Sequence, residues 1–478
     1  MKNKRLSKKT IVGYGIAGLG NNVAASLFYT YFIFYLTTIA GVSPAVAGMI
    51  SSIAVLWDGI NDPMIGYWSD NCRSKYGRRR PFQITGMVPL ALVIIGMFVN
   101  PGFSQSGKAA YYIIINILFW FVFTWTDVPT ISLADALDGS YDDKMKARTA
   151  WTTCVTIAGL LAVDLPPLFV EYMEKNGATA EKAWFIMAVI GACVTLMAYF
   201  ISWNATRGKE VIPEYVESSG GKEKRPGFFR QYMETFKNKS MIYACVGILL
   251  IYCASSGSIL ASMNYILQFN LGLGGAKTSM YLFAFSASQI LGSVILGMIS
   301  SRYDHKIGGR TKQMGYINII AGSIAIIAFL AGGSKPAVVL AAFILEGFLS
   351  ACFWLHGWDV GIDASKLDLY KTGVDHSCEY TAFIGFSFKI GGAIGMWIVG
   401  MILELFGFNG DAAVQSASAL NGIEIVFYIV TGICFLAGGL VFMKSPLTRK
   451  KLDAVLKGIE KKKQGETADE SEFSDLLW

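Results

Sequence analysis

Long apolar stretches, separated by short polar connections, dominate this chain of 478 residues. A run of about 18 or more predominantly apolar residues is long enough to cross a bilayer as a helix. Several of the runs exceed the roughly 20 residues that a span requires, so we expect tilted or kinked helices. The pattern predicts an all-α membrane protein with twelve transmembrane helices, at 11–39, 45–70, 82–99, 110–136, 147–171, 183–203, 240–270, 277–301, 314–331, 336–364, 378–406 and 420–443.

A long polar stretch, residues 204–239, divides the chain at its middle and contains SSGGKEK, a composition typical of linkers. On either side of it, GYWSDNCRSKYGRRRP from Gly66 aligns with GMISSRYDHKIGGRTK from Gly297. Such a repeat predicts two parallel six-helix halves, which resembles the major-facilitator fold. We therefore expect an N-terminal half (1–203), a cytoplasmic central loop (204–239), a C-terminal half (240–443) and a cytoplasmic tail (444–478) that forms a surface helix and then a flexible end.

Composition excludes a water-soluble protein. Charged residues make up 16% of the chain, against about 25% in a soluble domain, and the mean hydropathy is +0.46. Lys and Arg gather at the N-terminus, in alternate connections and in the tail, which predicts a multi-pass protein of the plasma (cytoplasmic) membrane with both termini in the cytoplasm. These basic loops explain the net charge of +7, so the expected partner is the lipid bilayer and not nucleic acid.

Cysteine spacing and the polar residues indicate neither a cofactor nor an enzyme. The eight cysteines form no CxxC pair. Six lie inside apolar runs, Cys378 is the first residue of another run, and Cys72 lies in a connection. A thiol inside such a run usually acts as a small apolar side chain. We identify no nucleophile–base set at bilayer depth and expect no metal beyond a possible Na⁺.

Carboxylates inside the predicted membrane helices are the main candidates for function, because a charge at bilayer depth is costly. Asp58 and Asp62 are one helical turn apart, so both project from one face, and Asn61 lies beside them. In the fourth run, Thr124 and Asp127 are spaced i, i+3. These oxygen atoms would suit a small hard cation such as Na⁺, while paired carboxylates could instead carry H⁺. Alternatively, Asp58 pairs with a buried base.

The basic loop after the second run has two interpretations. It is an ordinary cytoplasmic loop rich in arginine, or its charges cap helix ends and make contacts that break when the conformation changes. The repeat, which matches Arg79 with Arg310, favours the second interpretation. The expected gating residues are Asp70, Arg73, Arg79 and Arg310.

The segment WDGINDPMIGYWSDNCRSKYGRRRP resembles the signature of the glycoside–pentoside–hexuronide:cation symporters, the melibiose-permease family. TDVP, ARTAW and FSFKIGGAIG, and GYGIAGLGNNVAAS near the N-terminus, extend the similarity over essentially the whole chain. The resemblance implies uptake of a sugar coupled to Na⁺, Li⁺ or H⁺. We expect the functional unit to be a monomer. The implied cation-site residues are Asp58, Asn61, Asp62, Thr124 and Asp127. The implied substrate-site residues are Asn21, Asn22, Tyr29, Asp127, Arg148, Trp354 and Lys389.

Several positions depart from the melibiose permease. Asn21 and Asn22 stand where it has Lys and Asp, and Ile384 and Gly385 stand where it has Gln and Thr. An anionic sugar such as a uronide is one alternative, because Arg148 can bind a carboxylate in bidentate fashion. An amphipathic lipid or steroid-like ligand is another, and a non-transporting sensor is a third. The sequence assigns no role to three further polar residues, Asp164, Glu346 and His356.

Overall fold

The computed structural model describes residues 5–72, 74–210, 237–373, 376–410, 412, 414–464, 466 and 470–477. Within its helices, the side chains of residues 60, 63, 67, 70, 71, 135, 141, 142, 301, 304, 378, 379 and 463 lie outside this description. The described part is helical and contains no β-strand; a single isolated bridge joins Leu137 and Glu210. Most of the predicted central loop falls on undescribed residues.

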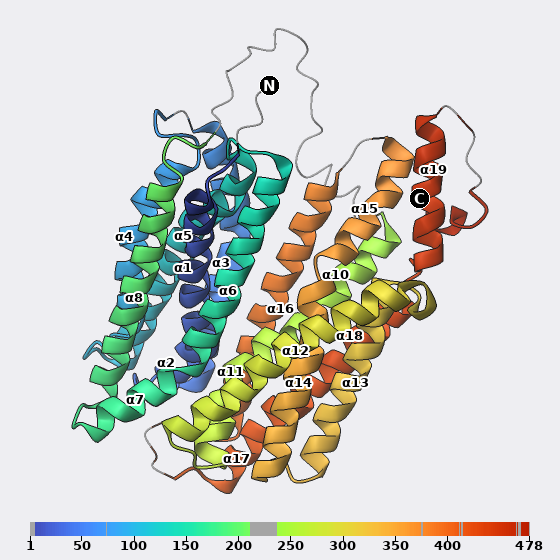
Figure 1. Cartoon of the computed structure of the whole chain (residues 1–478). Helices are drawn as coiled ribbons and strands as arrows, with labels where there is room; N and C mark the ends of the chain where they lie inside the picture. The colour runs from blue at the N-terminus through green and yellow to red at the C-terminus, as the bar shows by residue number, and fades with distance from the viewer. Residues whose placement is uncertain are drawn as a thin grey trace. The chain divides into compact units, whose positions relative to one another are not determined.

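Contacts between Cα atoms divide the chain into two compact units. Unit 1 holds the described residues of Met1–Val216, Leu260–Phe283 and Met396–Ile423. Figure 1 shows α1, α3, α4, α5, α6 and α8 running side by side as a bundle. The helices of unit 1 are α1 (Lys8–Ser26), the π-helical η1 (Leu27–Phe32), α2 (Ile33–Thr38), α3 (Pro44–Asn71), α4 (Arg80–Met97), α5 (Gln105–Ala136), α6 (Tyr141–Asp164), α7 (Pro166–Lys175), α8 (Ala180–Ala205), α11 (Ala261–Tyr265), η3 (Ile266–Asn270), the first part of α12 (Gly275–Ile307), the last part of α16 (Ser377–Leu405) and most of α17 (Ala417–Glu424).

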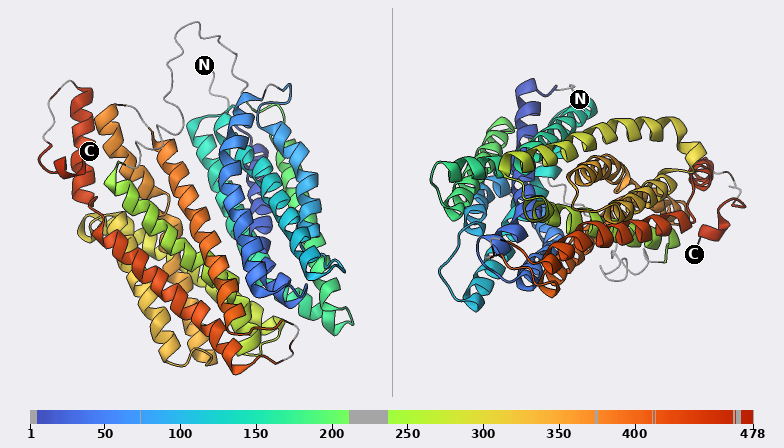
Figure 2. Two further views of the ribbon diagram at one scale, coloured as in Figure 1. Left: turned by 180° about the vertical axis from the view of Figure 1, so that it is seen from behind. Right: turned by 90° about the horizontal axis from the view of Figure 1, so that it is seen from below.

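Unit 2 holds the described residues of Glu217–Ile259, Ala284–Gly395 and Glu424–Trp478. In it, α18 packs against both α10 and α13, and α13 also packs against α14, as the view from behind in Figure 2 shows. Its helices are α10 (Lys239–Tyr252), most of the π-helical η2 (Cys253–Leu260), parts of α12 (Gly275–Ile307) and α16 (Ser377–Leu405), and α13 (Arg310–Leu330), α14 (Pro336–His356), α15 (Asp359–Thr372), η4 (Ile425–Val430), α18 (Thr431–Lys444), α19 (Arg449–Lys463) and η5 (Ser474–Leu476).

All twelve predicted runs fall on helical segments. Three of them, 11–39, 240–270 and 420–443, contain π-helical segments, and two others are divided between separate α-helices. The run 147–171 breaks at Leu165, and Pro166 begins α7 because proline has no N–H to continue the preceding helix. The run 336–364 breaks after His356, and a new helix begins at Asp359. Asp359 and Asp363 therefore belong to the separate helix α15.

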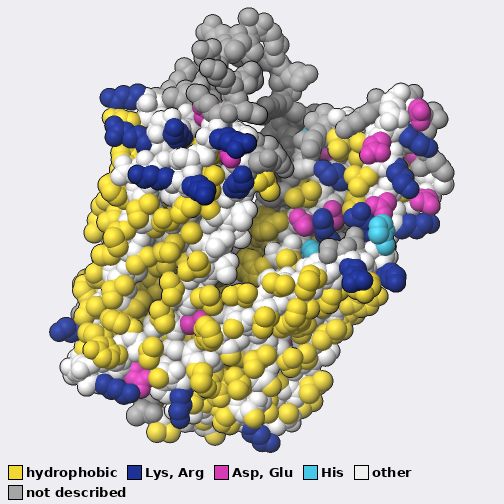
Figure 3. Space-filling model, in the orientation of Figure 1, with side chains coloured by type: hydrophobic (Ala, Val, Ile, Leu, Met, Phe, Trp, Pro, Cys, Tyr) yellow, Lys and Arg dark blue, Asp and Glu magenta, His cyan; other side chains and the backbone are white. Residues whose placement is uncertain are grey.

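The described helices present apolar surface along their flanks. Eleven helical segments in the described part of the chain are long and apolar enough to cross a membrane. The remaining predicted run, 45–70, lies on α3, which includes undescribed side chains. Large apolar side chains such as Leu92 (63% exposed) and Leu330 (77% exposed) stand on these flanks, and Figure 3 shows hydrophobic side chains covering them. A bilayer is the environment that covers such a surface.

Small residues allow helices within each unit to approach closely. A Cβ added at Gly18 of α1 would lie 2.7 Å from the carbonyl oxygen of Trp151 on α6. In unit 2, a Cβ added at Gly257 of η2 would lie 2.5 Å from the Cα of Gly395 on α16. Close backbone contact of this kind is common between membrane helices, where packing rather than the hydrophobic effect drives association.

The tail differs from the flexible end that the sequence predicts. The predicted surface helix is α19, and it packs against α15. Residues 470–477 fold back onto the same region, where Phe473 is completely buried and its ring meets that of Tyr370 edge-on at 5.0 Å. The prediction of flexibility was therefore wrong for residues 470–477, because Phe473 and Leu476 supply apolar side chains to a small core.

Candidate functional site

The packing of α3 against α5 brings together a buried polar cluster in unit 1, which we call the Asp58 group: Asp58, Asn61 and Thr124. Asp58 is 4% exposed, and the Thr124 hydroxyl donates to its Oδ1 at 2.5 Å. Asn61 is completely buried, and its Nδ2 donates to the carbonyl oxygen of Trp120 at 3.2 Å. The hydrogen bond across the two helices holds the Asp58 carboxylate in a fixed position.

One oxygen atom of the Asp58 group stands out. Asn61 Oδ1 is buried and has no hydrogen-bond partner among the described residues. A buried acceptor without a partner is costly, so such an atom needs a donor or a cation. Together with the Asp58 carboxylate and the Thr124 hydroxyl, it makes three kinds of oxygen ligand available, which is the chemistry that a hard monovalent or divalent cation prefers. The residues present therefore fit a small cation.

The two other predicted cation ligands are half-buried. Asp62 lies one turn beyond Asp58 on α3, and Asp127 lies three residues after Thr124 on α5. The Asp127 carboxylate accepts a hydrogen bond from Asn21 Nδ2 of α1 at 2.5 Å. Asp127 thus joins α5 to α1, the helix that carries the predicted sugar-site asparagines.

The predicted substrate residues of unit 1 line α1, η1 and α6. Asn22 Nδ2 donates to the carbonyl oxygen of Val155 on α6 at 2.7 Å. Tyr29 lies in η1, and its ring meets that of Trp120 edge-on at 5.8 Å. Because the Trp120 carbonyl also accepts from Asn61, this residue connects the Asp58 group to Tyr29. Arg148 lies exposed near the start of α6.

The other two predicted substrate residues belong to unit 2. Trp354 is 50% exposed at the end of α14, and its ring contacts that of Phe353. Lys389 is partly buried midway along α16. The predicted substrate residues are therefore divided between the two units.

Tyr199 of α8 is a polar residue that the sequence analysis did not select. Its side chain is completely buried, and its hydroxyl has no hydrogen-bond partner among the described residues. The sequence does contain a signal that could have identified Tyr199, namely a tyrosine within the apolar run 183–203. A buried phenol normally needs a polar partner, so such a tyrosine is a candidate for a polar site.

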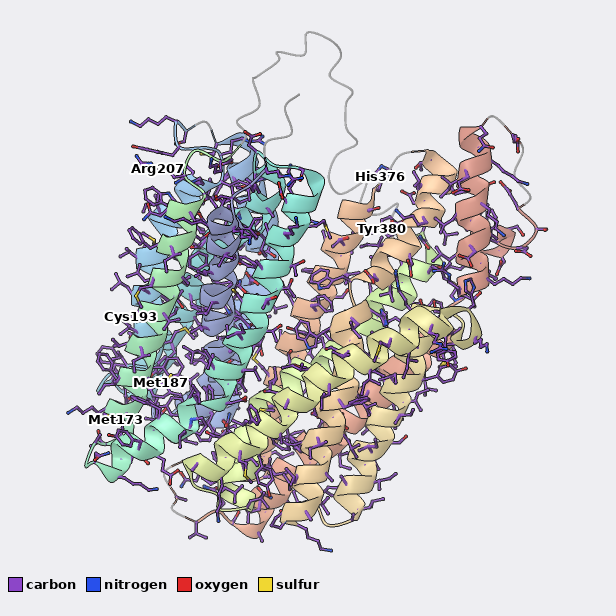
Figure 4. All side chains as sticks on the ribbon, viewed as in Figure 1. Met173, Met187, Cys193, Arg207, His376 and Tyr380 are labelled. Carbon is purple, nitrogen blue, oxygen red and sulfur yellow. The ribbon has the colours of Figure 1, made fainter. Side chains whose placement is uncertain are left out.

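The two matched basic loops make different contacts. In the first, Gly77 has a φ of +111°, and the Arg79 side chain donates to the carbonyl oxygen of Ser132 on α5 at 2.5 Å. Glu210 Oε1 accepts from the backbone N–H groups of Arg78 and Arg79 and so caps the start of α4. Figure 4 places Arg207 just beyond the nearby end of α8, whereas Met173 of α7 lies near the opposite end of the bundle.

In the second loop, Gly308 has a φ of +96°, and Arg310 comes two residues after it. The Arg310 side chain lies 3.2 Å from Asp363 and 3.5 Å from Asp359, both on α15. The matched glycines thus share a left-handed backbone that favours glycine, while the matched arginines bind different kinds of acceptor. The side chain of Asp70 and the whole of Arg73, the other expected gating residues, lie outside the described residues.

Comparison with known proteins gives matches over most of the chain. A family model described as MFS/sugar transport protein matches residues 13–449. The chain is 24% identical over 452 residues to the isoprimeverose transporter of Lactiplantibacillus pentosus, covering 93% of this chain and 90% of that one. It is 24% identical over 467 residues to the glucuronide carrier protein homolog of Escherichia coli, covering 97% of each.

Solved structures with a similar fold are also transporters. A D-xylose-proton symporter matches with a TM-score of 0.63 and 12% identity, covering 92% of this chain and 98% of that one. A bacterial homolog of the human lysosomal transporter Spinster, in an inward-facing and occupied conformation, matches with a TM-score of 0.68 and 11% identity, covering 93% and 97%. At these identities, the likeness shows the fold alone.

Proposed function

The chain belongs to the MFS/sugar transport protein family, and from this membership we propose that it couples the entry of a cation to the uptake of a sugar, glycoside or hexuronide. The membership confirms the predicted major-facilitator fold and the resemblance to the glycoside–pentoside–hexuronide:cation symporters. It also confirms a multi-pass membrane transporter rather than an enzyme. The coupling ion, the substrate and the direction of transport belong to the proposal.

The Asp58 group is the observation that carries the proposal. A carboxylate and a hydroxyl group are bonded across α3 and α5, and Asn61, one turn along α3 from Asp58, has a buried amide oxygen without a described partner. We assign Na⁺, H⁺ or Li⁺ to this group, with Asp62 as a further ligand. Asp127, which is bonded to Asn21, would connect cation binding to the sugar. If the cation favours the sugar-binding state, the sugar must strengthen cation binding by the same factor.

The proposed substrate is a glycoside or a hexuronide. Asn21 donates one amide hydrogen to Asp127 and retains a carbonyl oxygen and a second N–H for a sugar hydroxyl. Arg148 of α6 is the candidate in unit 1 for the positive charge that would bind a uronide carboxylate, and Lys389 of α16 is the candidate in unit 2. Relatives named for isoprimeverose and for a glucuronide are in keeping with either class.

The structure does not favour a lipid-like substrate. Ile384 is completely buried, and a Cβ added at Gly361 of α15 would lie 2.5 Å from its Cγ1. Ile384 therefore packs between α16 and α15 instead of presenting an apolar surface to a ligand.

The proposed orientation places both termini in the cytoplasm. The proposed functional unit is the monomer. Lys and Arg side chains gather at the end of unit 1 where α3 ends and α4 begins, as Figure 3 shows. Because cytoplasmic loops carry the excess of Lys and Arg, this end is assigned to the cytoplasm.

The proposal can be tested by counterflow in proteoliposomes with a panel of neutral sugars, uronides and lysolipids, with and without Na⁺. We expect exchange of at least one sugar or uronide and none of the lysolipids. Exchange of lysolipids alone would overturn the substrate assignment. Asp58→Cys should abolish stimulation by the cation, while Asp475→Asn, an exposed change in the tail, serves as the matched control.

A further inference from the structure

Glu346 is a buried acid to which neither the sequence analysis nor the proposed function assigns a role. It lies at the middle of α14 in unit 2 and is 3% exposed. Neither of its carboxylate oxygens has a hydrogen-bond partner among the described residues, and none of those residues forms an ion pair with it. An ionised carboxylate in such a position would be far more costly than the neutral acid.

Aromatic side chains lie on both sides of Glu346 along the same face of α14. One turn before it, Phe343 stacks on Phe427 of η4, with ring centroids 5.4 Å apart. Two turns after it, Phe353 contacts Tyr252 of α10 at 5.5 Å and Phe388 of α16 at 5.2 Å. The buried face that carries Glu346 is therefore closed at both ends by ring contacts.

The hydroxyl one turn after Glu346 on the same helix is already engaged. Ser350, one turn after Glu346, donates to the carbonyl oxygen of Gly347 at 2.8 Å and accepts from Gln289 Nε2 of α12 at 3.0 Å. The α12 helix also approaches closely here, because a Cβ added at Gly347 would lie 2.4 Å from the carbonyl oxygen of Phe285. This packing leaves little room for additional ligands on that side.

The charged groups around α14 stand mostly at helix ends. Lys389 is partly buried midway along α16 and has interactions of its own. The other described titratable groups of unit 2 on the elements around α14 are Lys239, Tyr243, Cys245 and Tyr252 on α10, Cys253 on η2, Arg302, Tyr303, His305 and Lys306 on α12, Arg310, Lys312 and Tyr316 on α13, Lys335 just before α14, Cys352 and His356 on α14, Asp359, Asp363, Lys366, Asp368, Tyr370 and Lys371 on α15, Tyr380 on α16, Glu424 at the end of α17, Tyr428 on η4, and Cys434 and Lys444 on α18.

These surroundings decide which cation Glu346 can bind. A metal cation requires several oxygen ligands around it, whereas a proton requires only one carboxylate oxygen. The Asp58 group has the mixed oxygen atoms that a metal cation needs, and Glu346 has aromatic neighbours and an engaged serine.

We propose that Glu346 is a second cation site of this protein, specific for the proton, and that it holds a proton in the conformation described here. The site lies in unit 2 and is separate from the Asp58 group of unit 1. The inference goes beyond the proposed function, since it requires neither a particular substrate nor a particular ion at Asp58. Access of water to Glu346 in another conformation would allow the proton to leave.

Infrared spectroscopy of the purified protein in lipid tests the site directly. The wild type at neutral pH should show the C=O stretch of a protonated carboxylic acid, and Glu346→Gln should remove it. Glu346→Asp should shift this band without removing it. The matched control is Glu404→Gln, which changes an exposed glutamate of α16 and should leave the band unchanged.

The two variants keep the inference falsifiable even if one of them does not fold. If the acid band is missing in the wild type, or keeps its position and intensity in every folded Glu346 variant, the proposal is overturned. Should Glu346→Gln fail to fold, a shift of the band in Glu346→Asp supports the site and an unshifted band refutes it.

Transport measurements separate this inference from the proposed function. As pH rises, wild-type uptake should fall when Glu346 loses its proton, and Glu346→Gln should flatten that fall while keeping its dependence on the coupling cation. If Glu346→Gln retains the complete wild-type pH profile, the proton site has no part in transport and the inference fails. Loss of cation dependence only in Asp58 variants would still support the proposed function.

Discussion

Asp58 in unit 1 and Glu346 in unit 2 are both almost completely buried, at 4% and 3% exposure, yet their surroundings differ. The Asp58 carboxylate receives the Thr124 hydroxyl and lies beside the amide of Asn61. The Glu346 carboxyl has no described hydrogen-bond partner, and aromatic rings flank it along its helix. Burial alone therefore does not determine which cation a membrane carboxylate binds; the supply of neighbouring oxygen atoms does.

Among the changes that test this comparison, substitution of Asp58 should have the largest effect, and the effect is on cation-stimulated uptake. Asp58→Asn removes the negative charge but keeps the shape, so stimulation of uptake by the coupling cation should be lost. The loss should exceed the roughly 10–100-fold decrease that removal of an outer partner of a metal ligand causes. Uptake across a range of cation concentrations measures it, and a variant with wild-type cation dependence would refute the assignment.

Substitution of Thr124 should have a smaller effect on the same group. Thr124→Val keeps the size of the side chain and removes the hydroxyl that bonds to Asp58. Since a hydrogen bond to a charged group contributes about 1.5–3 kcal/mol, the apparent affinity for the cation should fall by roughly tenfold or more. Thr124→Ser restores the hydroxyl and should restore the affinity. Equal cation affinities in the Val and Ser variants would show that the hydroxyl has no role.

Replacement of Glu346 by an apolar residue should be tolerated. Glu346→Met is similar in length and needs no hydrogen-bond partner, so the midpoint of thermal unfolding should equal or exceed that of the wild type. The corresponding change Asp58→Met should lower the midpoint, because it leaves the Thr124 hydroxyl without its acceptor. A large decrease in the Glu346→Met midpoint would show that the carboxyl makes a stabilising contact.

The smallest expected effect comes from a partly exposed ion pair, that of Arg310 with Asp359 and Asp363. Arg310 and Asp359 are each 36% exposed, and Asp363 is 14% exposed. Screening by water limits such pairs to about 0–1 kcal/mol, so Arg310→Gln should shift the unfolding midpoint by only a few degrees. Arg310→Lys keeps the charge and is the control. A shift of the unfolding midpoint as large as that of Asp58→Met would mean that the exposed fraction of a carboxylate does not indicate how much its contacts stabilise the protein.

Helix positions could be predicted from the sequence because apolar runs bounded by Lys, Arg and Gly leave a chain in lipid little choice but to form helices. The proline pair that begins at Pro166 is visible in the sequence, but the sequence does not show whether the helix ends there or only kinks. At Gly357, the break arises without a proline signal. The π-helical segments η1 and η2 follow no pattern of apolar residues.

The candidate site could be predicted only in part. The spacing of Asp58 with Asp62, and of Thr124 with Asp127, identified the residues on each helix. The bond between Asn21 and Asp127 joins residues 106 positions apart, and no local spacing reports such a contact. Glu346 could be recognised as a charge at membrane depth, but its missing partners are a property of the packed helices. The roles of these residues stay predictions.

Uptake driven by imposed ion gradients tests the central claim most directly. Proteoliposomes containing wild type or Asp58→Asn would receive either a Na⁺ gradient or a proton gradient, with the sugar that the counterflow panel selects. We predict that at least one gradient drives accumulation by the wild type, and that neither drives it in Asp58→Asn, although exchange of the sugar persists. Accumulation by Asp58→Asn to the wild-type level under the same gradient would contradict the assignment of the coupling cation to the Asp58 group.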